Sequence, residues 1–320
     1  MATPMGQQAA SVGALAGIWA AVPTPFLADG AVDLEGVAGN ATLYRDRFGC
    51  DGIFCNGIMG EGFALTLSER QDVLTAMLAG AGDAMAVGVV VTHHAPAEML
   101  TLARHAGQAG AHHIILMRPR GQYLDDELIA LAAAAVDAAG RPLVIFESPA
   151  PGMSFGANII DRLARRGLVL AVKAPGGDKA VAGLRRQVAD ARLICNPHED
   201  QFLVELARNP EAPLYANPEP YLYQSGASQP IRAYRDALIV GDAPTAYAHW
   251  RRLQPLRAAY DRWVMGELDH GRSPVPALKH WAARAGLKTG PTRFPLQPLP
   301  AEAAAALDAE LDAAGAPRVG

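Results

Sequence analysis

The chain has 320 residues and a mass of 33.6 kDa, enough to bury a large core. Half of the residues are hydrophobic and 19% are charged, a composition that excludes an intrinsically disordered chain. The net charge of −4 and the isoelectric point near 6.1 give no electrostatic basis for binding nucleic acid or an anionic membrane, so we expect neither as a partner.

The cysteines and the first residues of the chain bear on the cellular location of the protein. Cys50, Cys55 and Cys195 are odd in number and lack metal-ligand spacing, which predicts reduced thiols in a cytoplasmic protein. Residues 1–16 contain no basic segment ahead of an apolar core, so we expect a flexible tail rather than a signal peptide. Apolar runs such as residues 130–135 are far too short to cross a membrane.

Strands and helices alternate over most of the chain. Short apolar runs closed by turn residues predict strands at 17–22, 51–56, 86–91, 114–117, 143–147, 168–173, 193–196 and 214–217. Helices are predicted at 33–48, from 68 onward, and at 96–108, 125–139, 159–166, 179–189 and 199–208. Asp33 is the expected N-cap of the first helix, and Ser68-Glu69-Arg70-Gln71 has capping-box form. Eight such units predict a (β/α)₈ TIM barrel over residues 17–225.

Beyond residue 217 only helical patterns remain. They cover residues 229–240, 244–264, 274–284 and 301–314. No linker or change in composition precedes them. We therefore expect residues 226–320 to be a helical region packed on the barrel.

Lys173 ends the predicted sixth strand. Five apolar residues precede it and Pro175-Gly176-Gly177 follow, a pattern typical of a strand that is buried on both faces. α/β barrels carry their chemistry at the carboxyl ends of their strands. Burial there can lower the pKa of a lysine from ~10.4 towards ~7–8, where the free amine attacks carbonyl groups. The alternative is a lysine that reaches solvent or pairs with a carboxylate.

Other polar residues also follow predicted strands. The loop at residues 57–62 has three glycines whose amides could bind a carboxylate, although many such loops are simple turns. His93 and His94 follow the third strand, and His198 follows the seventh, whereas His112 and His113 precede the fourth. The chain has neither a His-x-His pair on the first strand nor a His-Glu-x-x-His helix, so we expect no metal.

From about residue 17 to 298 the chain resembles the dihydrodipicolinate synthase/N-acetylneuraminate lyase superfamily. The resemblance rests on motifs that occur in the family's order. They are Pro23-Thr24-Pro25-Phe26, Gly57-x-x-Gly60-Glu61, Ala64-Leu65-Thr66-x-x-Glu69-Arg70, Lys173, Pro274-Val275-Pro276-Ala277-Leu278-Lys279 and Arg293-Phe294-Pro295-Leu296-Gln297-Pro298.

The resemblance implies a Schiff base between Lys173 and a 2-oxo acid, commonly pyruvate. The protonated imine then serves as an electron sink for a carbon–carbon or carbon–oxygen lyase. It also implies a homotetramer and no cofactor. Candidate substrate-binding residues on the corresponding loop and strand are Gly57, Ile58, Met59, Gly60, Phe146 and Glu147.

The chain departs from the family pattern at its proton-transfer groups. Ile58 and Met59 replace hydroxyl residues, and Phe146 stands at the position of the proton-shuttling tyrosine. A second tyrosine is absent near Arg120-Gly121, and Pro151 replaces a carboxylate-binding arginine. Phenylalanine cannot transfer a proton. Glu147, Ser148, His198 and Tyr215 are possible replacements, but strand alternation points only one of Phe146 and Glu147 into the barrel, and the family register favours Phe146.

We therefore predict a lyase that uses Lys173, with Tyr215 or His198 in proton transfer, and not a genuine dihydrodipicolinate synthase. The apolar side chains favour a bulkier or aromatic aldehyde portion in the substrate. Two alternatives remain from the sequence. One is a ligand-binding or regulatory paralogue without turnover, and the other is a metal-dependent barrel enzyme that uses the His and Glu residues.

Overall fold

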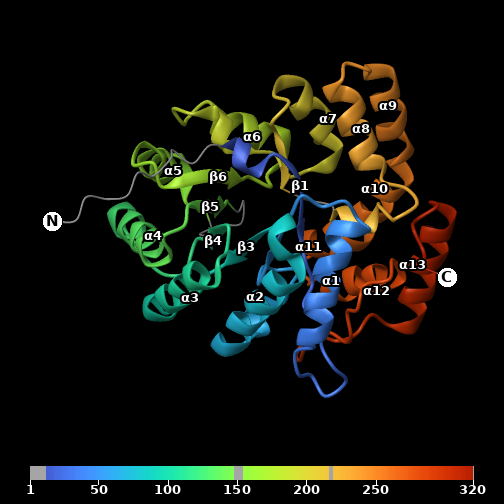
Figure 1. The fold of residues 1–320 in the computed structure, drawn as a ribbon, viewed down its shortest axis with the longest axis horizontal. Coiled ribbons are helices and arrows are strands. Elements are labelled where there is room, and N and C mark those ends of the chain that lie inside the picture. Colours follow the sequence, from blue (N-terminus) through green and yellow to red (C-terminus); the bar gives the residue numbers. More distant parts are fainter. Residues whose placement is uncertain (1–11, 148–153, 216–218, 320) are drawn as a thin grey trace.

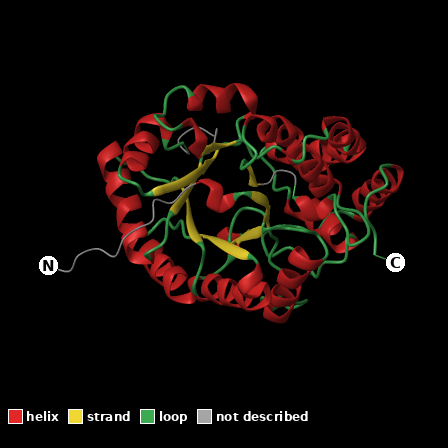
Figure 2. Ribbon diagram, turned by 45° about the horizontal axis from the view of Figure 1, so that its top comes forward, coloured by secondary structure: helices red, strands yellow, loops and turns green. Residues whose placement is uncertain are grey.

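Eight parallel strands form a barrel at the centre of the molecule (Figure 2). The computed structural model describes residues 12–147, 154–215 and 219–319. The strands are β1 (Gly17–Ala21), β2 (Gly52–Cys55), β3 (Ala86–Val90), β4 (His113–Met117), β5 (Leu143–Phe146), β6 (Val169–Lys173), β7 (Ile194–Cys195) and β8 (Pro213–Tyr215). Their hydrogen-bonded order is β7-β6-β5-β4-β3-β2-β1-β8, so within the described residues the ladder stops between β7 and β8. The predicted (β/α)₈ barrel is confirmed.

Helices surround the barrel, and further helices gather on one side of it (Figure 1). The surrounding helices are α1 (Leu34–Asp46), α2 (Leu67–Ala81), α3 (Pro96–Ala109), α4 (Asp125–Ala139), α5 (Gly156–Arg165), α6 (Gly177–Arg185) and α7 (Glu199–Arg208). The C-terminal helices are α8 (Pro230–Ile239), α9 (Ala243–Arg252), α10 (Gln254–Tyr260), α11 (Gly266–Asp269), α12 (Val275–Arg284) and α13 (Ala301–Ala313). Short turns of other helix types are η1 (Val12–Leu15), η2 (Gly62–Ala64), η3 (Gly82–Ala84), η4 (Ala191–Leu193), η5 (Pro220–Leu222) and the π-helix η6 (Asp261–Met265).

Three local predictions need correction. Part of the predicted flexible tail has regular structure, because η1 covers Val12–Leu15 and buried Leu15 accepts a hydrogen bond from the Trp19 indole. Residues 1–11 lie outside the described residues. The capping box of α2 belongs to Thr66, not Ser68: Thr66 and Glu69 each satisfy the other's backbone amide. The helix predicted at 244–264 is interrupted after Arg252, because Pro255 lies in the first turn of α10 and has no amide hydrogen to continue α9.

Bulky side chains fill the amino-terminal half of the barrel. Trp19, His113 and Tyr215 are all buried, with their rings within 5.8 Å of one another. Gly52 and Gly88 make room for them, because an added Cβ would collide with the Trp19 ring at the first position and the His113 ring at the second. This packed floor leaves the carboxyl ends of the strands as the place for chemistry.

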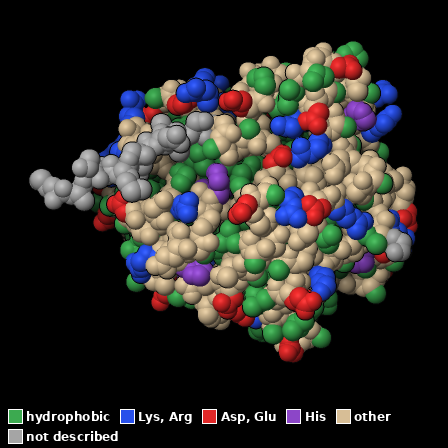
Figure 3. Space-filling view, viewed as in Figure 1, with side chains coloured by type: hydrophobic (Ala, Val, Ile, Leu, Met, Phe, Trp, Pro, Cys, Tyr) green, Lys and Arg blue, Asp and Glu red, His purple; other side chains and the backbone are tan. Residues whose placement is uncertain are grey.

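Buried ion pairs attach the C-terminal helices to the barrel. The Arg257 guanidinium of α10 donates to both carboxylate oxygens of Glu199 on α7, at 2.7 and 2.9 Å. Lys279 of α12 forms a 2.6 Å ion pair with Glu61, which follows β2. Acidic and basic side chains intermingle on the face shown in Figure 3. No helix in the described part of the chain is long and apolar enough to cross a membrane.

Candidate active site

Lys173 ends β6 with its side chain buried among aromatic rings. It is only 3% exposed, and its Nζ lies 5.0 Å from the ring centre of Phe54 and 4.9 Å from that of Phe146. Phe146 is its ladder partner, and paired residues share one face of a sheet. Desolvation lowers the pKa of Lys173 from its ordinary 10.5 to about 8, against an opposing effect of Glu219. The fraction of free amine near neutral pH is therefore larger than for an exposed lysine.

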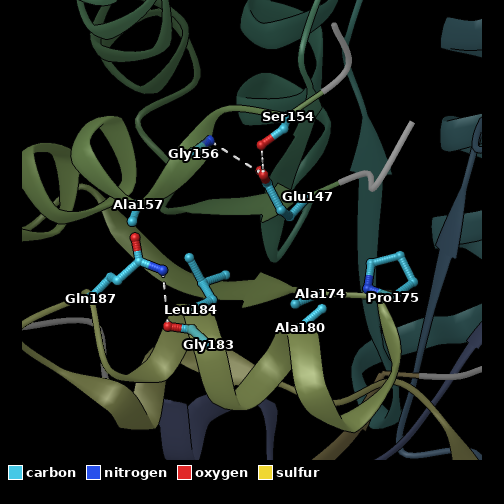
Figure 4. A pocket seen from close by; sticks show the side chains of 11 residues that line it. Glu147, Ser154, Gly156, Ala157, Ala174, Pro175, Ala180, Gly183, Leu184 and Gln187 are labelled. Carbon is cyan, nitrogen blue, oxygen red and sulfur yellow. Dashed lines mark hydrogen bonds between the residues drawn. The ribbon is translucent and has the colours of Figure 1, made fainter. Parts of the chain in front are cut away.

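Glu147 points away from this amine. Its carboxylate accepts hydrogen bonds from Ser154 Oγ and from the backbone amide of Gly156 (3.3 Å), at the start of α5 (Figure 4). It also accepts one from the backbone amide of Phe155 (2.9 Å). Strand alternation explains the arrangement, since the neighbouring Phe146 faces Lys173. Glu147 also lines a cavity of about 470 Å³ that borders Ala174 and Pro175. The described contacts thus give Glu147 a helix-capping role; Ser148 and Pro151 lie outside the described residues.

Tyr215 lies beside the site, but its hydroxyl points to the barrel floor. Its ring stacks on Phe54 with centroids 4.6 Å apart, while its oxygen lies 2.6 Å from Nε2 of His113. Burial raises the pKa of Tyr215 well above 10 and lowers the pKa of His113 well below 6.5. The structure therefore brings Tyr215 together with His113, a partner that its position before β4 did not suggest.

His198 follows β7, the strand that pairs with the Lys173 strand, and occupies the N-cap position of α7. Its Nε2 is buried and has no hydrogen-bond partner among the described residues. Burial lowers the pKa of His198; Asp200 opposes this effect and Lys173 adds to it. It opens into a cavity of about 360 Å³ that is also lined by Tyr223, Arg257 and Tyr260. His198 is thus electrostatically linked to Lys173 and borders a polar space.

Contacts with residues from other parts of the chain fix the loop after β2. Glu61 has a left-handed backbone (φ 52°) and is fully buried. Besides its ion pair with Lys279, it accepts a 2.8 Å hydrogen bond from the Arg293 amide. The Thr24 hydroxyl donates to the Gly60 carbonyl at 2.7 Å. These contacts fix the backbone of the loop.

The predicted binding residues of this loop face different surroundings. Met59 is buried, whereas Gly57 and Ile58 line a cavity of about 430 Å³ at the ends of β2, β3 and β4. That cavity is also bordered by His93, His94 and Arg70. Among the described residues, no group of three or more His, Cys, Asp or Glu side chains could hold a metal ion.

Glu219 is the residue that the sequence analysis missed. It is fully buried just beyond β8, and its Oε2 accepts a 2.8 Å hydrogen bond from the amide of Ala21 at the end of β1. Desolvation raises the pKa of Glu219 from 4.5 to about 8, against the opposing charge of Lys173. An acidic residue shortly after the predicted strand 214–217 was the available signal, but Tyr215 was the only residue of this region among the candidates.

The site can now be compared with known proteins. The family model described as "Dihydrodipicolinate synthetase family" matches residues 14–207. The chain belongs to this family. It is 29% identical over 297 residues to a 4-hydroxy-tetrahydrodipicolinate synthase of Acidothermus cellulolyticus, covering 92% of this chain and 91% of the relative. It is 26% identical over 287 residues to an N-acetylneuraminate lyase of Rhizobium meliloti, covering 88% and 90%.

The fold is also similar to those of solved structures. A prophage protein of E. coli K12 from the dihydrodipicolinic acid synthase family, in complex with pyruvate, superimposes with a TM-score of 0.77. The match is 20% identical and covers 94% of this chain and 98% of that one. The predicted family resemblance is confirmed, and the protein is an enzyme of a Schiff-base lyase family.

Proposed function

We propose that Lys173 forms a Schiff base with a 2-oxo acid and that the protein is a carbon–carbon or carbon–oxygen lyase. The observation that carries this proposal is a buried amine at the carboxyl end of β6 whose pKa is lowered to about 8. The free amine attacks the carbonyl carbon, water leaves, and the iminium withdraws electrons from the bond to be broken. Pyruvate, bound by the E. coli structural relative, is the first substrate to test.

The loop over Gly57–Gly60 is the proposed carboxylate site. It has no side-chain hydroxyl at Ile58 or Met59, so backbone amides would supply the hydrogen bonds. The Phe54 and Phe146 rings beside Nζ form an apolar wall. We propose that the substrate carries a bulky or aromatic part that packs on this wall.

Borohydride trapping tests the Schiff base. The protein is incubated with pyruvate or a bulkier 2-oxo acid, reduced and digested, and the adduct is located by mass spectrometry. The chain has only four lysines, Lys173, Lys179, Lys279 and Lys288, so each can be mapped separately. We expect one adduct on Lys173 and none after Lys173→Arg, because arginine keeps the charge without a nucleophilic amine. Exposed Lys179→Arg is the matched control and should trap normally.

Failure to trap any 2-oxo acid from a broad panel on Lys173 would refute the proposal. In that case a binding protein without turnover becomes the better interpretation of the barrel. Trapping on another lysine would equally contradict the assignment of Lys173. Activity lost on chelation and restored by one divalent ion would instead support the metal-dependent alternative.

We further propose that the reaction is not dihydrodipicolinate synthesis, although several relatives carry that activity in their names. Phe146 stands beside Lys173 where the family resemblance expects a proton-shuttling tyrosine. General acid–base catalysis typically contributes ~10²–10⁴ in rate, so the rate of dihydrodipicolinate synthesis should be far below that of such synthases. An assay with pyruvate and aspartate semialdehyde decides the matter, and a rate normal for such synthases would disprove this proposal.

A homotetramer in the cytoplasm is the proposed state of assembly. Its support is the family resemblance, together with the outward exposure of Phe63 (62%) and Leu124 (72%) near the ends of β2 and β4. Burying such side chains between subunits would remove apolar surface from water. Analytical ultracentrifugation of the purified chain tests it, and a monomer at working concentration would refute it.

A further inference from the structure

The cavity of about 430 Å³ at the ends of β2, β3 and β4 has basic side chains in its wall and no acidic ones. Its basic lining residues are Arg70, Arg118, Arg120, His93 and His94. Among the described residues that line it there is no aspartate or glutamate. The residues outside the described ranges include neither type, so none of them supplies an acidic side chain. Because arginine stays positively charged in proteins, this cavity attracts anions.

Arg70 is a buried arginine whose described contacts are all uncharged. It lies on α2 and is 4% exposed. Its Nη1 donates to the Thr92 carbonyl at 2.9 Å, and its Nη2 donates to the Val90 carbonyl at 2.6 Å. Its Nε is buried without a hydrogen-bond partner in the described part of the chain, and no described carboxylate forms an ion pair with it. A buried charge normally has a counter-charge, so this contact set is incomplete.

Arg257 shows how the same fold satisfies a buried guanidinium elsewhere. It is 6% exposed and donates to both carboxylate oxygens of Glu199. Burial alone would lower the pKa of Arg257, but Glu199 raises it above the ordinary value. Burial lowers the pKa of Arg70 to about 10, with no carboxylate to oppose it. A bound anion would supply to Arg70 the counter-charge that Glu199 supplies to Arg257.

We propose that this cavity binds a small organic oxyanion, a carboxylate or a phosphate ester, with Arg70 as its buried anchor. Arg118 and Arg120 supply further positive charge from the segment after β4. The planar guanidinium presents N–H groups in a geometry that matches the oxygens of either anion. Ile58 and Leu65 line the same space and leave room for an apolar part of the ligand.

The cavity shares Gly57 and Ile58 with the loop proposed to bind the substrate carboxylate. The anion site must therefore be tested with ligands that cannot react at Lys173. A ligand without a keto or aldehyde group forms no Schiff base. Its binding is thus measured independently of the proposed function, and either proposal can fail while the other stands.

Isothermal titration calorimetry of the full chain at constant ionic strength tests the inference. The probes are inorganic phosphate, phenyl phosphate, phenylacetate and phenylacetamide. Phenylacetamide is the matched neutral control, because it has the shape of phenylacetate without its charge. We expect saturable binding of at least one anion, and at least about tenfold weaker binding of the neutral amide, because charge-assisted hydrogen bonds are the stronger ones. The tighter of phenylacetate and phenyl phosphate identifies the type of oxyanion.

Arg70→Gln removes the buried guanidinium and should weaken binding of the preferred anion by at least about tenfold. Arg70→Lys keeps a charge without the planar fork, so its affinity should lie between those of Arg70→Gln and the wild type. Arg251→Gln is the matched control: it removes one charge from exposed α9, outside the cavity, and should bind like the wild type. If Arg70→Gln does not fold, Arg120→Gln takes its place, because Arg120 is exposed and lines the cavity, and it too should weaken binding.

Four results would overturn the anion site. They are no saturable binding of any of the three anions, equal affinity for phenylacetate and phenylacetamide, unchanged affinity in folded Arg70→Gln, and an equal loss in Arg251→Gln. The last of these would show that only the net charge of the protein matters. Failure to trap a 2-oxo acid on Lys173 would remove the proposed function and leave this site untouched.

Discussion

Lys173 and Lys279 are two buried lysines in nearly the same surroundings, and we propose different roles for them. Each is 3% exposed, each has an aromatic ring within 5.0 Å of its Nζ, and each has a buried glutamate in its neighbourhood. Lys279 is in direct contact with its glutamate, Glu61, at 2.6 Å and also donates to the Pro291 carbonyl at 2.8 Å. Glu219 instead gives its hydrogen bond to Ala21.

The contacts of Lys279 explain the structural role of that lysine, and we propose a reactive role for Lys173. A direct ion pair with a second hydrogen bond stabilises the ammonium and holds α12 against the loop after β2. At Lys173 desolvation outweighs the charge of Glu219 and lowers the pKa to about 8, and burial lowers the pKa of Lys279 as well. The types of residue are the same, so their contacts decide the chemistry.

The largest effect should come from replacing each lysine with arginine. Lys173→Arg removes the nucleophile, so turnover and the trapped adduct should both fall to background. Lys279→Arg keeps a cation opposite Glu61, and its Lys173 should still form the adduct. Turnover on a substrate found by trapping, with circular dichroism to verify folding, measures both. Normal turnover in folded Lys173→Arg would show that Lys173 is not the nucleophile.

Breaking the Lys279 pair should be the largest change in stability. Glu61→Gln leaves a buried ammonium without its counter-charge, which typically costs about 3–5 kcal/mol in the free energy of unfolding. Denaturant titration measures the loss. The double variant Glu61→Gln with Lys279→Met should recover part of it, because no buried charge then remains. A loss below about 1 kcal/mol would show that the pair behaves like an exposed one.

Tyr215→Phe should have a smaller effect, on stability more than on turnover. It leaves Nε2 of buried His113 without its 2.6 Å partner, and such an unpaired group costs about 1–3 kcal/mol. His198→Ala is the companion variant, since His198 is the other predicted proton donor. A fall in kcat with unchanged KM in either variant would assign proton transfer to that residue.

The smallest effect should be a pH-dependent difference between wild type and Lys173→Met. The folded-state pKa of about 8 lies below the ordinary 10.5, so the unfolded chain binds more protons between these values. The wild type therefore gains stability as pH rises from about 8 to 10.5, and pays the full desolvation cost below 8. Lys173→Met should be the more stable protein at pH 7, with an advantage that shrinks above pH 8. Thermal unfolding across this range would disagree if the advantage grew instead.

The order of strands and helices was readable from the sequence because buried parallel strands are short apolar runs with regular spacing. Lys173 was readable for the same reason: a charge at the end of such a run is conspicuous. The opposite directions of Phe146 and Glu147 followed from strand alternation. These features all depend on neighbours in the chain.

The remaining features depend on contacts between distant residues. Nothing local showed that His113 would meet Tyr215 across 102 positions, or that Glu219 would bond Ala21 across 198. The start of α2 was missed because Thr66 and Ser68 are both good caps and only the contact with Glu69 separates them. The break after α9 was missed because a proline in the first turn of a helix can equally lie within a longer helical pattern.

The gap in the ladder between β7 and β8 has a mechanical consequence. Within the described residues no ladder hydrogen bonds join these two strands, so a small widening of the barrel there breaks none. Lys173 is paired with Cys195 of β7, one strand away from the gap. A widening of the barrel at this gap would therefore move the strand next to Lys173 without breaking a ladder hydrogen bond, whereas the packed aromatic floor opposes such a change.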